Sequence, residues 1–179
     1  TQARLDNWEG VLQILQSNLY VNLNDIADVL GLAAKAEKVP IVELLFKRYD
    51  IDDVVKTTLL NSNEVHHVAI IELLVLNGAR ITFRTFKKAM TMDSFETMEM
   101  LCIYGRHYLY DTSHSGTILF FACASGKLRL IETIVRSIPQ RDRGKFLKIA
   151  PSEHPWRTAL YGAVHSNNVD IIDYLGQLG

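Results

Sequence analysis

Five segments of the chain end in the same kind of apolar helix, and this internal repetition restricts the possible folds more than any other feature of the sequence. In each segment an acidic residue follows two mostly apolar residues and precedes another apolar pair. The segments are PIVELLFKRY (40–49), AIIELLVLNGA (69–79), ETMEMLCIYG (96–105), RLIETIVRSI (129–138) and DIIDYLGQLG (170–179). A second short helical stretch precedes each of them. The pattern therefore predicts pairs of short helices joined by turns.

The first helix of each predicted pair carries a small residue at a fixed place. These residues are Ala33, Ser62, Ala89, Ala122 and Ala163, and the large apolar residues three positions before them are Leu30, Leu59, Phe86, Leu119 and Leu160. Twelve residues after the small one, the second helix has Leu45, Leu74, Leu101, Ile134 or Leu175. Successive small residues are 29, 27, 33 and 41 positions apart, so the differences in length must lie in the connections between pairs.

Three segments resemble the ankyrin repeat, whose pattern is G-x-T-P-L-H-x-A-x-x-x-G followed by an apolar second helix. They are TTLLNSNEVHHVAIIELLVLNGA (57–79), GTILFFACASGKLRLIETIV (116–135) and RTALYGAVHSNNVDIIDYLGQLG (157–179). The turn glycine is kept only at Gly126, and Glu37, His66, Asp93 and Asn167 stand in its place elsewhere. The resemblance implies an all-α fold, an ankyrin-type helix-turn-helix repeat solenoid.

With this alignment we expect a single ankyrin-like repeat domain over residues 1–179. It would hold a partial repeat at 1–25 and five repeats at about 26–53, 54–82, 83–107, 114–140 and 155–179. In the partial repeat, WEGVLQILQSNLY (8–20) matches only a second helix. The sequence begins without Met and ends within a motif, so we expect a fragment of a larger protein.

The composition excludes some classes of protein. With 48 % hydrophobic and 22 % charged residues and a net charge of −1, the chain is not typical of disordered segments or dedicated nucleic-acid binders. Residues 106–158 nevertheless hold nine Lys and Arg against four Asp and Glu. This excess is either ordinary surface variation or a basic patch for an acidic partner.

Two further features concern the cell compartment and the membrane. Cys102 and Cys123 lie within apolar helical patterns, which predicts buried free thiols and an intracellular (cytoplasmic or nuclear) protein. The apolar run at 68–76 is short and interrupted by Glu72, so we expect no membrane insertion.

The sequence contains no pattern that indicates catalysis. The six histidines lack a recognised ligand spacing, and the SHSG segment (113–116) lacks the frame of a hydrolase nucleophile. Glycines mark helix ends and form no phosphate-binding loop. We expect neither an enzyme nor a bound metal or cofactor.

Candidate partner-binding residues fall into two groups. The first group maps beside the concave groove that the ankyrin resemblance implies. Its members are either exposed contact residues or turned inward by a divergent repeat, and they are Phe83, Val65 and Met92. The second group lies in two connections and comprises Tyr108, Tyr110, Arg141, Arg143, Lys145, Trp156 and Arg157. If extended, the first connection would place both tyrosines on one side. These aromatic residues either anchor a partner or cover the ends of the core.

The leading functional hypothesis is a protein-protein interaction module that recognises a protein or peptide through its concave groove and hairpin loops. An alternative is an architectural or regulatory segment of a larger enzyme or channel. A narrower hypothesis is a reader of modified lysine, with Tyr108, Tyr110 and Trp156 as an aromatic cage. The sequence does not decide the oligomeric state or the partner.

Overall fold

The computed structural model describes residues 7–17 and 22–178, and all regular elements within these ranges are helices. The predicted all-α class is therefore confirmed. The chain divides between Arg80 and Ile81 into two compact units, the N-terminal unit and the C-terminal unit. Residues 1–6 and 18–21 of the predicted partial repeat lie outside the described residues.

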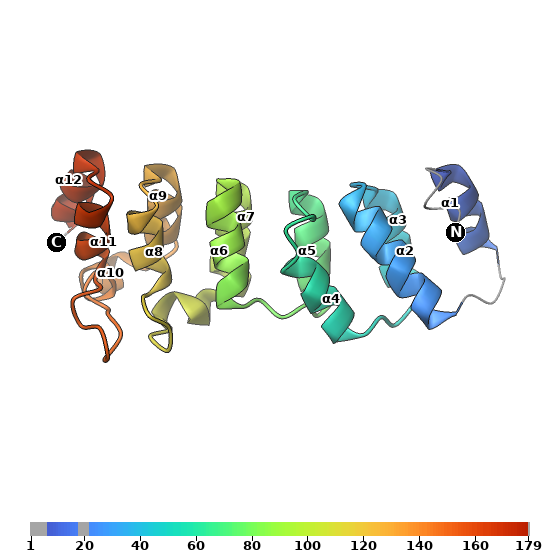
Figure 1. Cartoon of the computed structure of the whole chain (residues 1–179), viewed down its shortest axis with the longest axis horizontal. Coiled ribbons are helices and arrows are strands. Elements are labelled where there is room, and N and C mark those ends of the chain that lie inside the picture. Colours follow the sequence, from blue (N-terminus) through green and yellow to red (C-terminus); the bar gives the residue numbers. More distant parts are fainter. Residues whose placement is uncertain (1–6, 18–21, 179) are drawn as a thin grey trace. The chain divides into compact units, whose positions relative to one another are not determined.

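In its described part, the N-terminal unit contains one single helix and two helix pairs (Figure 1). The helices are α1 (Trp8–Gln16), the pair α2 (Leu23–Lys35) and α3 (Val39–Arg48), and the pair α4 (Asp53–Leu60) and α5 (Val68–Leu76). Between pairs, α2 contacts α4, and α3 contacts α5. Since α1 also packs on α3, it occupies the place of a second helix, as its sequence predicts.

The C-terminal unit contains three helix pairs, with two short helices in the connections between them (Figure 1). The pairs are α6 (Phe83–Met92) with α7 (Phe95–Tyr104), α8 (Ile118–Ala124) with α9 (Leu128–Arg136), and α11 (Ala159–His165) with α12 (Val169–Leu178). The 3-10 helix η2 (Arg106–Tyr110) precedes α8, and α10 (Gln140–Phe146) follows α9. First helices pack on first helices, α6 on α8 and α8 on α11, while α7 packs on α9.

A threonine begins each first helix of the C-terminal unit. The hydroxyl of Thr117 accepts a hydrogen bond from the Phe120 amide at 3.1 Å, and that of Thr158 accepts one from the Tyr161 amide at 3.3 Å. Thr82 caps α6 in the same way and forms a capping box with Thr85. These bonds satisfy amides that have no partner within the helix. The repeated threonine of the sequence motif therefore sets where each first helix starts.

The turns inside the pairs lie where the sequence alignment places them, with one exception. Glu37, Asp93, Gly126 and Asn167 have φ angles of 57°, 55°, 73° and 53°. This left-handed conformation suits glycine and is tolerated by Asn and Asp. The prediction for the second pair is wrong, because α4 ends at Leu60 and His66 has no positive φ. Ser62 accordingly lies beyond the helix.

The core follows the predicted alignment fully in three of the five pairs and in part in the last one. Ala33, Ala89, Ala122 and Ala163 are fully buried, as are Leu30 and Phe86, and Leu119 is 1 % exposed. On the second helices, Leu45, Leu74, Leu101, Ile134 and Leu175 are all buried. In the short helix α4 the buried positions are instead Lys56 and Leu60. Leu160, on α11, is 51 % exposed. Its counterpart Leu119, on α8, is covered by the next pair.

The closest packing between first helices occurs at Gly162 of α11. A Cβ atom on this residue would lie 2.6 Å from the Phe120 carbonyl oxygen and 3.2 Å from the Ala124 nitrogen. Because both atoms belong to the backbone of α8, they cannot move aside as a flexible side chain would. The absence of a side chain at Gly162 therefore allows the two helices to lie this close.

We expect Gly162→Ala to destabilise the protein by about 1–3 kcal/mol, because the added methyl group overpacks the α8–α11 contact. Gly144→Ala is the matched control, since no atom lies within 4 Å of a Cβ at this helical position. It should raise stability by up to about 1 kcal/mol through helix propensity alone. Urea unfolding of both variants measures the two effects. Equal stabilisation by both would contradict the close contact at Gly162.

Cys102 and Cys123 are buried free thiols, as the sequence predicts. Burial raises the pKa of Cys102 to about 11 and that of Cys123 to about 12, because a thiolate is poorly solvated away from water. Both groups therefore stay protonated at neutral pH. Since the thiolate is the reactive form, both should be chemically inert in the folded protein.

Iodoacetamide at pH 8 should accordingly modify neither Cys102 nor Cys123 in the folded protein on the time scale in which it modifies both in 8 M urea. Mass spectrometry of samples quenched over an hour would follow the two reactions. Rapid alkylation without denaturant would show that these thiols are accessible and ionised.

Candidate partner-binding site

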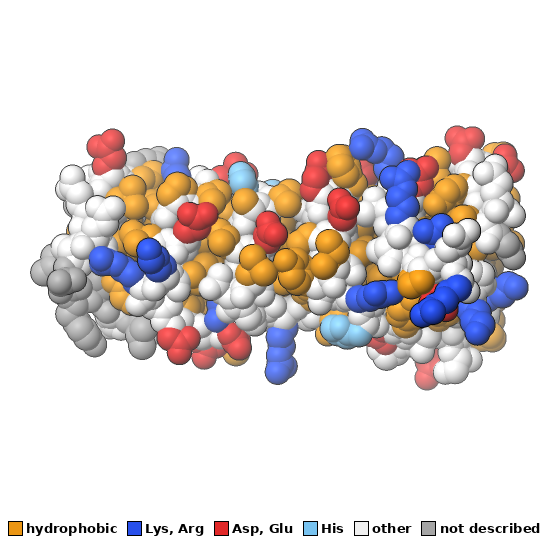
Figure 2. Space-filling view, turned by 180° about the vertical axis from the view of Figure 1, so that it is seen from behind, with side chains coloured by type: hydrophobic (Ala, Val, Ile, Leu, Met, Phe, Trp, Pro, Cys, Tyr) orange, Lys and Arg blue, Asp and Glu red, His pale blue; other side chains and the backbone are white. Residues whose placement is uncertain are grey.

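The long connection between the second and third pairs of the C-terminal unit forms a basic helix. Arg141 and Lys145 lie four residues apart on α10, and Lys148 follows its end; all three are exposed. The Arg141 side chain is 86 % exposed. Positions four apart share one side of a helix, so the positive charges face solvent together. Figure 2 shows Lys and Arg side chains gathered on the C-terminal unit, at the right of the view.

Two other residues of this connection attach it to the core. Phe146 is 2 % exposed. Arg143 is half-buried, and its Nε donates a hydrogen bond to the Ile138 carbonyl oxygen at 3.1 Å. Arg143 therefore holds α10 against the end of α9. Arg141 and Lys145 stay exposed, and Arg141 Nε lies 3.5 Å from the Asp142 carboxylate.

The two tyrosines of the preceding connection do not share a side. Residues 106–110 form a 3-10 helix instead of an extended strand, so positions two apart point in different directions. The Tyr108 ring lies 6.4 Å from the Phe86 ring, between centroids, whereas Tyr110 meets Phe146 edge to face at 5.3 Å. Tyr110 is 38 % exposed and borders α10, while Tyr108 is half-buried. The expectation based on an extended segment was therefore wrong.

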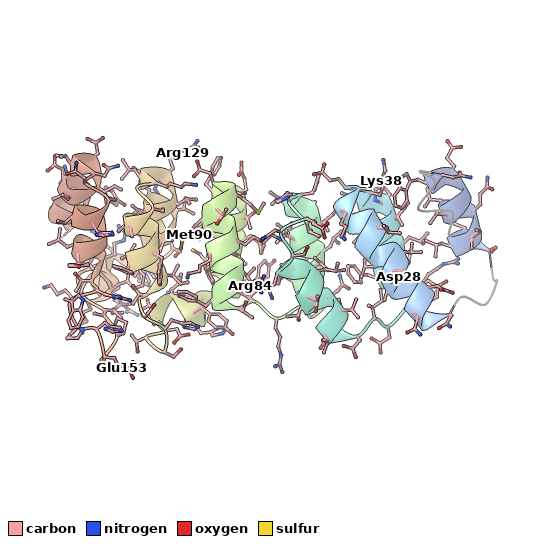
Figure 3. The ribbon with its side chains drawn as sticks, in the orientation of Figure 1. Asp28, Lys38, Arg84, Met90, Arg129 and Glu153 are labelled. Atoms are coloured by element: carbon pink, nitrogen blue, oxygen red, sulfur yellow. The ribbon has the colours of Figure 1, made fainter. Side chains whose placement is uncertain are left out.

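Trp156 lies on the surface, in the connection between α10 and α11. Its side chain is 54 % exposed and contacts the His154 ring at 5.3 Å. The neighbouring Arg157 donates a hydrogen bond to the Ser115 carbonyl oxygen at 2.7 Å and lies 5.9 Å from the Phe120 ring centroid. Glu153, labelled in Figure 3, lies in the loop between α10 and these residues. An exposed tryptophan in the same connection as exposed cations has the composition of a protein contact.

The residues expected near the groove are turned inward. Val65 is fully buried, because residues 61–67 form a connection after the early end of α4 instead of an exposed hairpin tip. Phe83 is 7 % exposed and stacks on His114 at 4.0 Å between ring centroids. Met92 is half-buried. Of the two alternatives for this group, the inward one is confirmed for Val65 and Phe83.

The proposed cage of Tyr108, Tyr110 and Trp156 gains no support from the geometry. Each of these rings contacts a different aromatic residue, namely Phe86, Phe146 and His154. A cation does lie over rings elsewhere in this unit. The Lys87 ammonium is 4.4 Å from the Phe121 centroid and 5.4 Å from that of Phe83.

Sequence reasoning missed a series of aromatic contacts across α6, α8 and α11, the first helices of the three pairs in the C-terminal unit. The series, which we call the ring series, consists of His114, Phe83, Phe121, Phe120, Tyr161 and His165. One signal was present, since Phe120 and Tyr161 occupy the same place in the motifs TILF and TALY. The non-local contacts of Phe83 and His114 had no comparable signal.

The chain matches no protein-family model and no curated protein. Within residues 7–17 and 22–178, no helix is long and apolar enough to cross a bilayer. No cluster of three His, Cys, Asp or Glu side chains in this described part is arranged to hold a metal ion.

We expect Trp156→Ala to change the free energy of unfolding by less than about 0.5 kcal/mol, because the indole lies mostly outside the core. Phe146→Ala should cost about 3–5 kcal/mol, since its ring, at the end of α10, is buried. Thermal and urea unfolding of both variants make the comparison. A loss from Trp156→Ala as large as that from Phe146→Ala would show that Trp156 covers the core.

Proposed function

We propose that the chain is an ankyrin-type repeat domain that binds a protein partner through the C-terminal unit. The repeat assignment is supported by the helix pairs, the threonine caps and the left-handed turn residues at equivalent positions. The binding surface would be the basic-aromatic face, formed by Tyr110, Arg141, Lys145, Lys148 and Trp156. This face lies in the longest connection of the chain and at its border with η2.

The observation that carries the proposal is the exposure of Trp156 within a connection that also exposes three cations. Contact of a large apolar ring with water is unfavourable, and burial of the ring against a partner removes this cost in free energy. The cations would attract an acidic partner and accelerate encounter, whereas Trp156 would supply the desolvated contact. A purely architectural segment would need neither feature, so the exposed aromatic residues favour recognition.

Partner capture with matched variants tests this proposal. The wild-type chain, Trp156→Ala and Arg141→Glu/Lys145→Glu serve as baits, with Lys47→Glu/Arg80→Glu as a control that makes the same change of charge at exposed sites of the N-terminal unit. Proteins retained by the wild-type chain and the control, but lost from the two test variants, are the expected partners. Quantitative mass spectrometry measures retention.

Binding kinetics with a purified partner then separate the two roles. Arg141→Glu/Lys145→Glu should lower the association rate about tenfold at low salt, with a smaller effect at 0.5 M salt where the charges are screened. Trp156→Ala should instead raise the dissociation rate. If both folded variants retain every partner at the wild-type level, the basic-aromatic face is not the binding surface. If no protein is enriched, the architectural alternative is favoured.

A further inference from the structure

The ring series is a chain of aromatic contacts that links α6, α8, α11 and the loop before α8. Successive ring centroids are 4.0 Å apart for His114 and Phe83, 5.4 Å for Phe83 and Phe121, and 5.0 Å for Phe121 and Phe120. Phe120 and Tyr161 follow at 6.4 Å, as do Tyr161 and His165. All six residues belong to the C-terminal unit. The series therefore runs from one helix pair to the next instead of along a single helix.

Burial divides the series into a floor and exposed rings. Phe83 and Phe120 are each 7 % exposed, so they belong to the core and fix the positions of their neighbours. Tyr161 is 45 % exposed, and His114 and His165 are also exposed. At the first end, the Asp111 carboxylate lies 3.3 Å from His114 Nδ1, and hydrogen bonds from Ser113 help to lower the pKa of Asp111. The exposed rings are thus held in place by buried ones and by an ordered loop.

Two cations accompany the series without a carboxylate partner. Lys87 lies over Phe121 and Phe83, and Arg157 lies over Phe120. Within residues 7–17 and 22–178, neither side chain has an Asp or Glu oxygen within 4.0 Å. Arg84, labelled in Figure 3 on the first turn of α6, is a second exposed cation on the same helix as Lys87. The surface therefore offers positive charge above two of its ring positions and an open ring at Tyr161.

We propose that the ring series is a second binding surface, which takes an extended acidic segment of a protein. On an extended chain, side chains at positions i and i+2 point to one side and lie about 6.6–6.8 Å apart. The step from Phe120 to Tyr161, 6.4 Å, is close to this repeat, whereas the step from Phe121 to Phe120 is shorter, at 5.0 Å. Two carboxylates two residues apart would pair with Lys87 and Arg157, and an aromatic side chain two residues further would stack on Tyr161.

This surface is distinct from the basic-aromatic face and depends on the proposed function only in taking a protein segment as its ligand. The expected ligand pattern is Glu-x-Glu-x-Tyr, read in either chain direction. A single-stranded nucleic acid could also stack on exposed rings, but it needs cations along its whole backbone. Here the cations lie over the rings, where a phosphate chain and a stacked base would compete for the same space.

Peptide binding to the full chain tests the proposal. The probe is a fluorescein-labelled peptide containing Glu-Ser-Glu-Ser-Tyr, prepared also in the reverse order, and anisotropy measures its affinity. A peptide with Lys in place of Glu and a labelled twelve-residue oligothymidine are the comparison ligands. We expect the acidic peptide to bind, more weakly at high salt, and the other two to show little binding.

Three variants locate the bound peptide. Lys87→Glu should weaken binding about tenfold by removing one ion pair and adding repulsion. Tyr161→Ala should weaken it as well, whereas Tyr161→Phe, which keeps the ring, should not. Lys47→Glu is the control, because it makes the same charge reversal on an exposed helix of the N-terminal unit.

The outcomes separate this proposal from the previous one. Absence of acidic-peptide binding, or equal affinity for Lys87→Glu and the wild-type chain, overturns the ring series as an acidic-segment site. Tighter binding of oligothymidine that falls in Tyr161→Ala also overturns it, in favour of nucleic acid. Neither result affects the partner capture by Trp156 and α10, because those residues are unchanged in all three variants.

Discussion

The close contact between first helices is the constraint on which the architecture of the C-terminal unit depends. A single short helix pair cannot bury its apolar surface by itself, so each pair must be covered by the next. Gly162 lets the backbone of α11 approach that of α8, and Ala122 and Ala163 are fully buried at this level. The same approach brings Phe120 and Tyr161 within ring contact. The packing that stabilises the unit therefore also creates its aromatic surface.

Polar side chains hold successive pairs together where helices end. The Lys127 ammonium donates a hydrogen bond to the Met90 carbonyl oxygen at 2.7 Å, at the end of α6, and lies 3.5 Å from the Asp93 carboxylate. Asn168, the residue after the next turn, donates to the Gly126 carbonyl oxygen at 3.2 Å. Met90 is labelled in Figure 3 on α6. The Met90 carbonyl oxygen also accepts a hydrogen bond from the Asp93 amide, so Lys127 adds a second donor at the end of α6, where positive charge is favourable.

The N-terminal unit uses the same principle with a buried lysine. Lys56 is 6 % exposed, and its ammonium donates to the Asn77 carbonyl oxygen at the end of α5 while pairing with the Asp53 carboxylate at 2.7 Å. A buried charge is tolerated only when it is paired and hydrogen-bonded, and Lys56 has both kinds of partner. This arrangement also explains why α4 departs from the repeated pattern. Its buried surface is built from Lys56 and Leu60 instead of a leucine and a small residue.

The sequence predicted the features that depend on local patterns. Helix pairs follow from apolar periodicity, and the turns at Glu37, Asp93 and Asn167 could be located because the flanking helices fix the count of residues. Features that depend on the path of a connection were not predictable in this way. Tyr108 and Tyr110 lie in a 3-10 helix, which turns them to different sides. Val65 is buried because α4 ends early. Of the candidate site, the sequence left open whether Trp156 anchors a partner or covers the core, and the structure shows it 54 % exposed. The ring series required three-dimensional contacts.

Charge is distributed unevenly between the two units. Residues 1–80 hold eleven Asp and Glu against seven Lys and Arg, whereas residues 81–179 hold nine against twelve. The net charge of −1 for the whole chain therefore conceals units of opposite sign. Charges further apart than about 8–10 Å are largely screened at physiological salt, so an approaching partner responds to the nearer unit and not to the sum. Both proposed surfaces lie on the positive unit, where aromatic side chains would supply contact area and cations would supply attraction. An acidic partner would thus be drawn to the C-terminal unit although the chain as a whole is slightly acidic.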